Sequence, residues 1–159
     1  MISLWNLHPF PSMVSVPDYV KSKLSGETND LITPIQVSEN LHLHADKALN
    51  LLDKLNAGEN KELANTLSDI RSMALLGKYY ACKINGATQL ALYRETREVS
   101  YQEASVKQLT NALEYWKAYT SNAMQQYKNP LWLKRVGHID WVKLTREVER
   151  DIELAGKEL

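Results

Sequence analysis

Cysteine and proline are scarce in this sequence of 159 residues, which contains one cysteine and five prolines. The single cysteine, Cys82, excludes a framework of internal disulfide bonds, and its place inside a helical pattern predicts that it packs in the core. No proline occurs between Pro34 and Pro130, so nothing in this stretch prevents helices from being long. The fold must therefore be held together by packing.

An excess of either charge is also absent, since 19 Lys and Arg residues balance 19 Asp and Glu residues. A nucleic-acid partner would call for a basic surface, so we expect none. Long apolar runs are missing too, because no segment approaches the roughly 20 residues of a membrane span, and the first residues lack a signal-peptide pattern. We expect a single domain over residues 1–159 that does not insert into a membrane.

A long helical seam is present within residues 60–97. Small or apolar side chains recur there at alternating spacings of four and three residues, which indicates one helix with a single buried stripe. The stripe consists of Leu63, Leu67, Ile70, Ala74, Gly77, Ala81, Ile84, Thr88 and Ala91. Its middle is small, so we expect another helix to come close at Gly77 and Ala81. Since a glycine inside a helix costs about 1 kcal/mol relative to alanine, we expect both Gly77 and Gly86 to serve close packing or a local bend.

Capping residues divide the rest of the chain into four shorter helices. Ser15 and Asp140 are good N-caps, and residues 33–36 and 100–103 match capping boxes. The predicted helices cover residues 15–24, 34–56, 60–97, 100–127 and 140–157, with an apolar loop after Asn129. Short connections between them favour antiparallel neighbours. The sequence therefore predicts an all-α fold, an antiparallel helical bundle of about five helices over residues 15–157 with one long central helix.

The first 14 residues differ from the rest, because they are apolar and contain two prolines that prevent a helix. Leu4, Trp5, Leu7 and Phe10 place four large apolar side chains in the first ten positions. We expect this extended segment to dock through Trp5 and Phe10 on another domain, and the chain to be a fragment of a longer protein.

No arrangement of residues predicts catalysis. Glu39 and His42 form the Glu-x-x-His element of di-metal helical bundles, but the element occurs once and such a site needs two, so a solvated pair is expected. Cys82 lies in the middle of a helix without a nucleophile elbow. We predict no catalytic residue, no metal ligand and no cofactor.

Three tryptophans lie outside the helical seams, and they are the more informative aromatic residues. Exposed indoles are typical of sugar-binding surfaces, although aromatic side chains also seal the ends of bundles and interfaces. We predict weak sugar stacking on Trp132 or Trp141, with His138 nearby, whereas Trp5 contacts another domain.

Several segments resemble the C-terminal helical region of large bacterial proteins that look like glycoside hydrolases related to α-glucuronidases, proteins that are often described as carbohydrate-binding. The segments are residues 75–87, 90–93, 101–104 and 112–119, and the resemblance extends over residues 31–154. It implies that catalysis belongs to an upstream barrel, which would be the partner domain in the same parent chain. It also implies a plant or host polysaccharide as substrate class and a location in the periplasm or at the cell surface.

The leading hypothesis is a non-catalytic helical accessory domain of such an enzyme, in contact with its catalytic domain and with an oligosaccharide. The alternative is a protein-protein interaction module, because Leu76-Gly77-x-x-Tyr80 matches the opening of a tetratricopeptide repeat. No second copy follows at the spacing of about 34 residues that such repeats require. A helical nucleotide-handling domain is a third class, and its usual Arg and His signature is missing.

Overall fold

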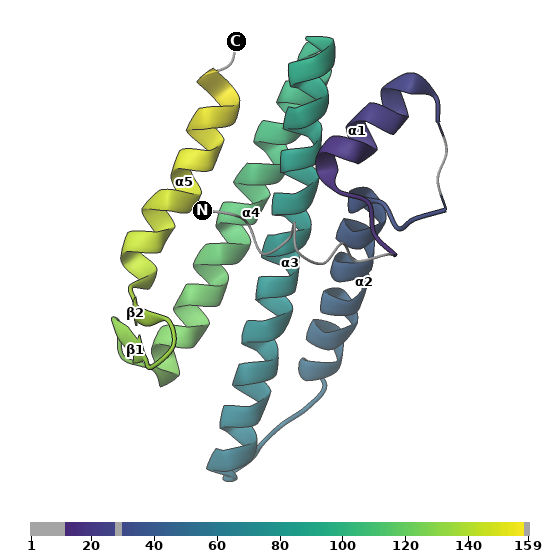
Figure 1. Cartoon of the computed structure of the whole chain (residues 1–159). Coiled ribbons are helices and arrows are strands. Elements are labelled where there is room, and N and C mark those ends of the chain that lie inside the picture. Colours follow the sequence, from purple (N-terminus) through teal and green to yellow (C-terminus); the bar gives the residue numbers. More distant parts are fainter. Residues whose placement is uncertain (1–11, 28–29, 158–159) are drawn as a thin grey trace.

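A computed structural model describes residues 12–27 and 30–157 of the chain. Within them lie the helices α1 (Val16–Ser25), α2 (Pro34–Leu52), α3 (Lys61–Thr96), α4 (Val99–Gln126) and α5 (Trp141–Lys157), and the strands β1 (Leu131–Leu133) and β2 (Gly137–Ile139). The helices α2 to α5 run alternately down and up, and α3 is the longest (Figure 1). The predicted all-α bundle with a long central helix is confirmed.

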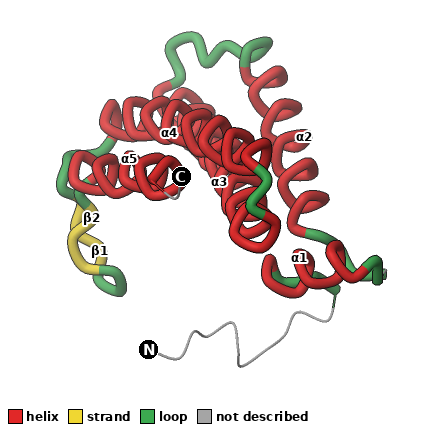
Figure 2. Tube along the Cα trace, turned by 90° about the horizontal axis from the view of Figure 1, so that it is seen from above, coloured by secondary structure: helices red, strands yellow, loops and turns green. Residues whose placement is uncertain are grey.

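The long helices are arranged in chain order. Helix α3 packs between α2 and α4, and α5 packs against α4, from where its Asp151 also pairs with Lys83 of α3. Seen from above, these helices follow one another along a curved row, and α1 lies across one end of it against α3 (Figure 2). Helix α3 therefore has two separate interfaces, one with α2 and one with α4. None of the helices within the described residues is long and apolar enough to cross a membrane.

The capping residues position most helix starts as predicted. Ser15 accepts a hydrogen bond from the backbone of Asp18, and Thr33 and Gln36 form a complete capping box. The box predicted at residues 100–103 is wrong, because α4 begins at Val99 and its N-cap, Glu98, makes no side-chain capping bond. Helix α3 ends on a left-handed residue, Arg97 (φ 60°), so the chain enters α4 directly and Ser100 is already in its first turn.

Two stretches predicted to be helical and buried are more exposed than expected. Helix α2 stops at Leu52, and the Asn56 side chain accepts a bond of 2.8 Å from the Gly58 amide in the following turn, which leaves Leu55 58% exposed. The first part of the α3 seam is also exposed, with Leu63 at 41% and Ile70 at 40%. The first turns of α3 extend beyond the ends of its neighbours (Figure 1). Ile70 instead lies level with those ends, where Arg71 pairs with Asp53 and Tyr127 bonds to Asp69.

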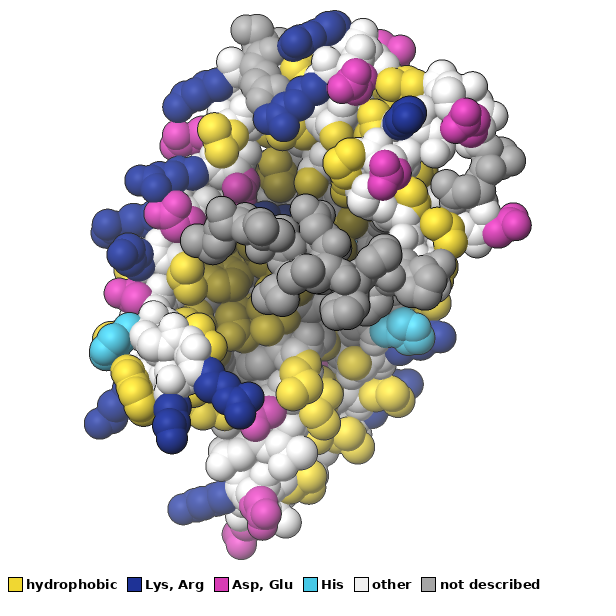
Figure 3. All heavy atoms as spheres, viewed as in Figure 1, with side chains coloured by type: hydrophobic (Ala, Val, Ile, Leu, Met, Phe, Trp, Pro, Cys, Tyr) yellow, Lys and Arg dark blue, Asp and Glu magenta, His cyan; other side chains and the backbone are white. Residues whose placement is uncertain are grey.

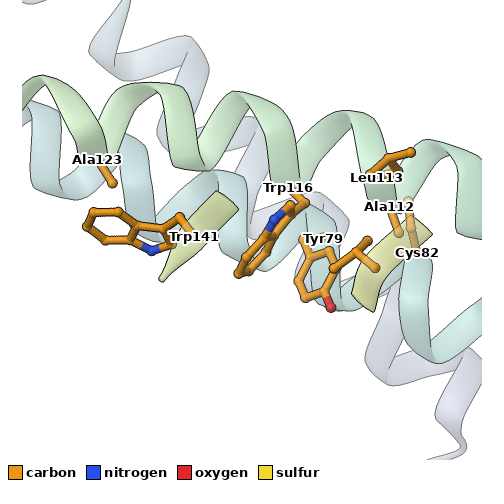
Figure 4. Close-up of a cluster of buried hydrophobic side chains, with 8 residues drawn as sticks. Tyr79, Cys82, Ala112, Leu113, Trp116, Ala123 and Trp141 are labelled. Atoms are coloured by element: carbon orange, nitrogen blue, oxygen red, sulfur yellow. The ribbon is translucent and has the colours of Figure 1, made fainter. Parts of the chain in front are cut away.

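The core lies between α3, α4 and α5, and Trp116 is at its centre. The Trp116 ring centroid is 5.2 Å from that of Tyr79 and 5.4 Å from that of Tyr119, and its Nε1 donates to the Thr145 hydroxyl at 2.9 Å. The buried members are Tyr79, Cys82, Ala112, Leu113, Trp116, Ala123, Trp141 and Val148. Figure 4 shows Trp141, Trp116 and Tyr79 in a row along the helices. The prediction that Cys82 packs in the core is confirmed.

The small residues of α3 mark close helix contacts, and the closer of the two glycine contacts is at Gly86. A Cβ atom added at Gly77 would lie 3.5 Å from the Ala45 Cβ, which is an ordinary contact with α2. At Gly86 it would lie 2.9 Å from the Leu109 Cγ of α4, a distance that real Cβ atoms do not reach. The α3–α4 interface therefore requires glycine at position 86, whereas the α2–α3 interface has room for a methyl group at position 77.

Candidate functional site

The segment predicted to be an apolar loop is a short antiparallel β-hairpin that carries two of the predicted site residues. Its register pairs Trp132 directly with His138, and the Trp132 side chain is 61% exposed. On the other face, Leu131 and Ile139 pack against the core cluster. Since side chains alternate between the two faces of a strand, Trp132 and His138 point away from the bundle. Three-residue strands are too short for an alternating pattern to be recognised in sequence.

The hairpin is tied to the bundle at its base. The Asn129 amide donates to the Asp140 carboxylate at 3.0 Å, and its oxygen accepts from the Trp141 backbone at 2.8 Å. The same carboxylate caps α5 by accepting from the amides of Val142 and Lys143. These bonds, the one from Asn129 first, hold the pKa of Asp140 below its ordinary value. Trp132 is therefore presented on an element whose two ends are held together.

Positive charge surrounds the hairpin although the whole chain is neutral. Residues 127–146 contain five Lys and Arg residues but a single carboxylate, that of Asp140. The basic residues are Lys128, Lys134, Arg135, Lys143 and Arg146, all exposed. Figure 3 shows Lys and Arg side chains gathered around this end of the molecule, at the lower left. The hairpin thus combines an exposed indole, an imidazole and several cations.

The remaining predicted site residues do not join this surface. Trp141 is 4% exposed, and its ring lies edge-on to Tyr119 at 6.4 Å, so it presents no face on which a sugar could stack. This part of the prediction is corrected: the indole at the start of α5 belongs to the core. Trp5 and Phe10, predicted to dock on another domain, lie outside the described residues.

A second group of chemically active side chains lies between α2, α3 and α4. The Cys82 Sγ is 3.5 Å from the His42 Nε2, and the Lys78 ammonium pairs with the Asp46 carboxylate. The Lys78 Nζ lies 5.1 Å from the centroid of the Tyr115 ring, and the His42 ring centroid lies 6.3 Å from that of Tyr115. We call these five residues the interior polar cluster. Glu39 is exposed, as expected for a solvated pair, whereas His42 is half-buried within this cluster.

Burial and the Lys78 charge shift the pKa values within the interior polar cluster. Burial, opposed by the Lys78 ammonium, raises the pKa of the Cys82 thiol. Burial first, and then Lys78, lower the pKa of His42. Burial also lowers the pKa of Lys78, but its hydrogen bond to Asp46 and the neighbouring Tyr115 outweigh this effect and raise it overall. The raised pKa of the Cys82 thiol disfavours the thiolate, which is the nucleophilic form of cysteine.

The interior polar cluster was missed in the sequence because its members come from three helices. Lys78 follows Gly77 in a stripe of small residues, and only the position of α2 shows that its ammonium meets Asp46. Among the described residues, no group of three or more His, Cys, Asp or Glu side chains is placed to hold a metal ion.

Comparisons with family models, with curated proteins and with solved structures found no match to this chain.

Proposed function

We propose that this chain is a non-catalytic helical accessory domain of a glycan-degrading protein, and that it binds oligosaccharide weakly through the β1–β2 hairpin. In the parent protein its neighbour would be a catalytic domain. The observation that carries the proposal is the Trp132 indole, 61% exposed and directly opposite His138 on a hairpin that is hydrogen-bonded at its base.

An exposed indole held in this way suits one face of a sugar ring. The ring supplies a flat apolar surface, and neighbouring polar side chains orient the hydroxyl groups. His138 lies across the strand pair from Trp132, so its imidazole is close enough to donate to or accept from a hydroxyl of the same sugar. A single platform of this kind predicts weak binding with low selectivity between neutral sugars.

The carboxylates beside the core favour a non-catalytic role. Glycoside hydrolysis needs two carboxyl groups facing each other across a sugar, about 5 to 10 Å apart. Asp46 instead pairs with Lys78, and Asp151 pairs with Lys83 to join α5 to α3. These pairs connect helices, which is a structural task.

Calorimetric titration with glucuronoxylan oligosaccharides tests the proposal. The Trp132→Ala variant is expected to bind at least about fivefold more weakly, because it removes the stacking surface. Tyr80→Ala is the matched control, since Tyr80 is 52% exposed on α3, away from the hairpin, and its loss is expected to leave binding unchanged. Reducing-end assays on the same substrates are expected to show no turnover.

Two results would contradict the proposal. Turnover by the purified wild-type chain would refute the non-catalytic role. Binding that is unaffected by Trp132→Ala, or no binding of any oligosaccharide, would remove the hairpin as a sugar site.

A further inference from the structure

We propose, on the basis of the function proposed above, that the hairpin selects oligosaccharides that carry negative charge. The ligand class is a saccharide with carboxylate or sulfate groups, stacked on Trp132 and held by Lys134 and Arg135.

The turn between the strands supplies the cations. Lys134 and Arg135 occupy the tip that follows β1, where the Val136 amide bonds back to the Leu133 carbonyl at 3.1 Å, and both side chains are exposed. Neither has an ion-pair partner among the described residues. A carboxylate or sulfate on a sugar ring at Trp132 would lie within reach of these long side chains, and Arg presents a fork that matches such groups.

The local carboxylate offsets only one of these cations. One oxygen of Asp140 accepts hydrogen bonds from Asn129, Val142 and Lys143, which closes the hairpin and caps α5, while five Lys and Arg residues lie within residues 127–146. Elsewhere the two signs are mixed, as in the pairs Arg150–Glu147 and Lys157–Glu153 on α5. The segment around the hairpin thus carries an excess of positive charge, although the chain as a whole has no net charge.

Two other anionic partners fit the surface less well. A membrane would need one continuous apolar face, whereas Trp132 lies on the face of the hairpin opposite to Leu131 and Leu133. Single-stranded nucleic acid is typically bound on successive aromatic platforms along a basic groove. Here the strands offer one outward indole, which suits a single sugar ring.

The experiment compares charged and neutral ligands of equal length on the whole chain. Calorimetric titrations use oligogalacturonate and neutral xylo-oligosaccharide at low and at physiological salt, with poly-dT and phosphatidylserine vesicles as further probes. Oligogalacturonate is expected to bind roughly five- to tenfold more tightly than the neutral ligand, with the difference shrinking as salt screens the charges.

Substitutions of the charged side chains test whether Lys134 and Arg135 cause the preference for oligogalacturonate. Lys134→Gln with Arg135→Gln is expected to reduce oligogalacturonate affinity roughly five- to tenfold and to leave the affinity for the neutral ligand unchanged. The control, Lys47→Gln with Lys54→Gln, removes two exposed cations from the region of α2 and is expected to change neither.

The outcomes separate the two proposals. Equal binding of charged and neutral ligands, or selectivity that survives the Lys134 and Arg135 substitutions, would overturn this inference and leave the proposed function standing. No binding of either saccharide would overturn both. Tighter binding of poly-dT or of vesicles than of oligogalacturonate would assign the surface to that partner and also overturn the inference.

Discussion

The two interfaces of α3 consist of chemically different side chains, although they lie on the same helix. Toward α4 and α5 the contact is aromatic, with Tyr79 against Trp116, and at Gly86 it is so close that an added methyl group would have to displace the Leu109 side chain. Toward α2 the contact is looser at Gly77 and contains the interior polar cluster. The comparison indicates that stability is concentrated on the α4 side, whereas sensitivity to pH is concentrated on the α2 side.

Trp116→Ala attacks the aromatic interface and is expected to have the largest effect. The substitution leaves a cavity among Tyr79, Tyr119 and Trp141 and removes the indole N–H that donates to the Thr145 hydroxyl. We expect a loss of about 3 to 5 kcal/mol in the free energy of unfolding, measured by urea denaturation. Tyr80→Ala, at an exposed position on α3, should cost less than about 1 kcal/mol. Similar losses for the two variants would show that the aromatic cluster is not the main source of stability.

Substitutions at Gly77 and Gly86 of α3 test how closely α2 and α4 approach this helix. Alanine at either position improves helix propensity by about 1 kcal/mol. Gly77→Ala should therefore raise the melting temperature or leave it unchanged, because the added Cβ would lie at an ordinary van der Waals distance from the Ala45 Cβ. Gly86→Ala should be net destabilising by about 1 to 3 kcal/mol, because its Cβ would overlap Leu109. The reverse order of melting temperatures would contradict the geometry of both interfaces.

The pH dependence of stability tests the interior polar cluster, and we expect it to be the smallest of these effects. Because the pKa of His42 is lower in the folded chain than its ordinary value of 6.5, the unfolded chain takes up the proton first. The stability associated with His42 is complete above pH 6.5 and is lost as the pH falls toward the folded-state pKa. Protonated His42 would face Lys78, Cys82 and Tyr115, with Asp46 as the only carboxylate of the cluster.

Urea midpoints measured from pH 8 to pH 5 check this expectation. The midpoint of the wild type should fall across this range, and the fall should be smaller for His42→Gln. His44→Gln is the control, because His44 is exposed on the same helix and its replacement should leave the slope unchanged. Equal slopes for the wild type and His42→Gln would show that His42 does not contribute.

Periodic and local patterns in the sequence were enough to predict the helices of the bundle, but not all of their boundaries. Residues 60–97 were recognised as one helix because a stripe of small and apolar side chains repeats along it, and Ser15 and Thr33 identified two helix starts through local hydrogen bonds. The false capping box at Ser100 shows the limit of such motifs, since the left-handed Arg97 decided where α4 begins.

The candidate site was only partly predictable for a related reason. Trp132 and His138 were identified separately as loop residues near each other in sequence, but their pairing across two three-residue strands has no periodic signal. Trp141 was misjudged because a tryptophan at a helix start looks the same in sequence whether it faces solvent or Tyr119. The interior polar cluster depends on how α2 and α4 are placed around α3, which is tertiary information.

Two serines on the neighbours of α3 determine where along its axis each neighbour can sit. The Ser38 hydroxyl of α2 donates to the Ala81 carbonyl, and the Ser105 hydroxyl of α4 donates to the Gly86 carbonyl, both at 2.8 Å and both from fully buried side chains. Two helices that touch only through small side chains can shift along each other's axes, because successive turns present similar surfaces. Moving either neighbour by one residue, about 1.5 Å, would separate a buried hydroxyl from its acceptor. The two serines therefore fix the axial positions of α2 and α4 along α3. The two chemically different interfaces of α3 consequently keep a constant position relative to each other.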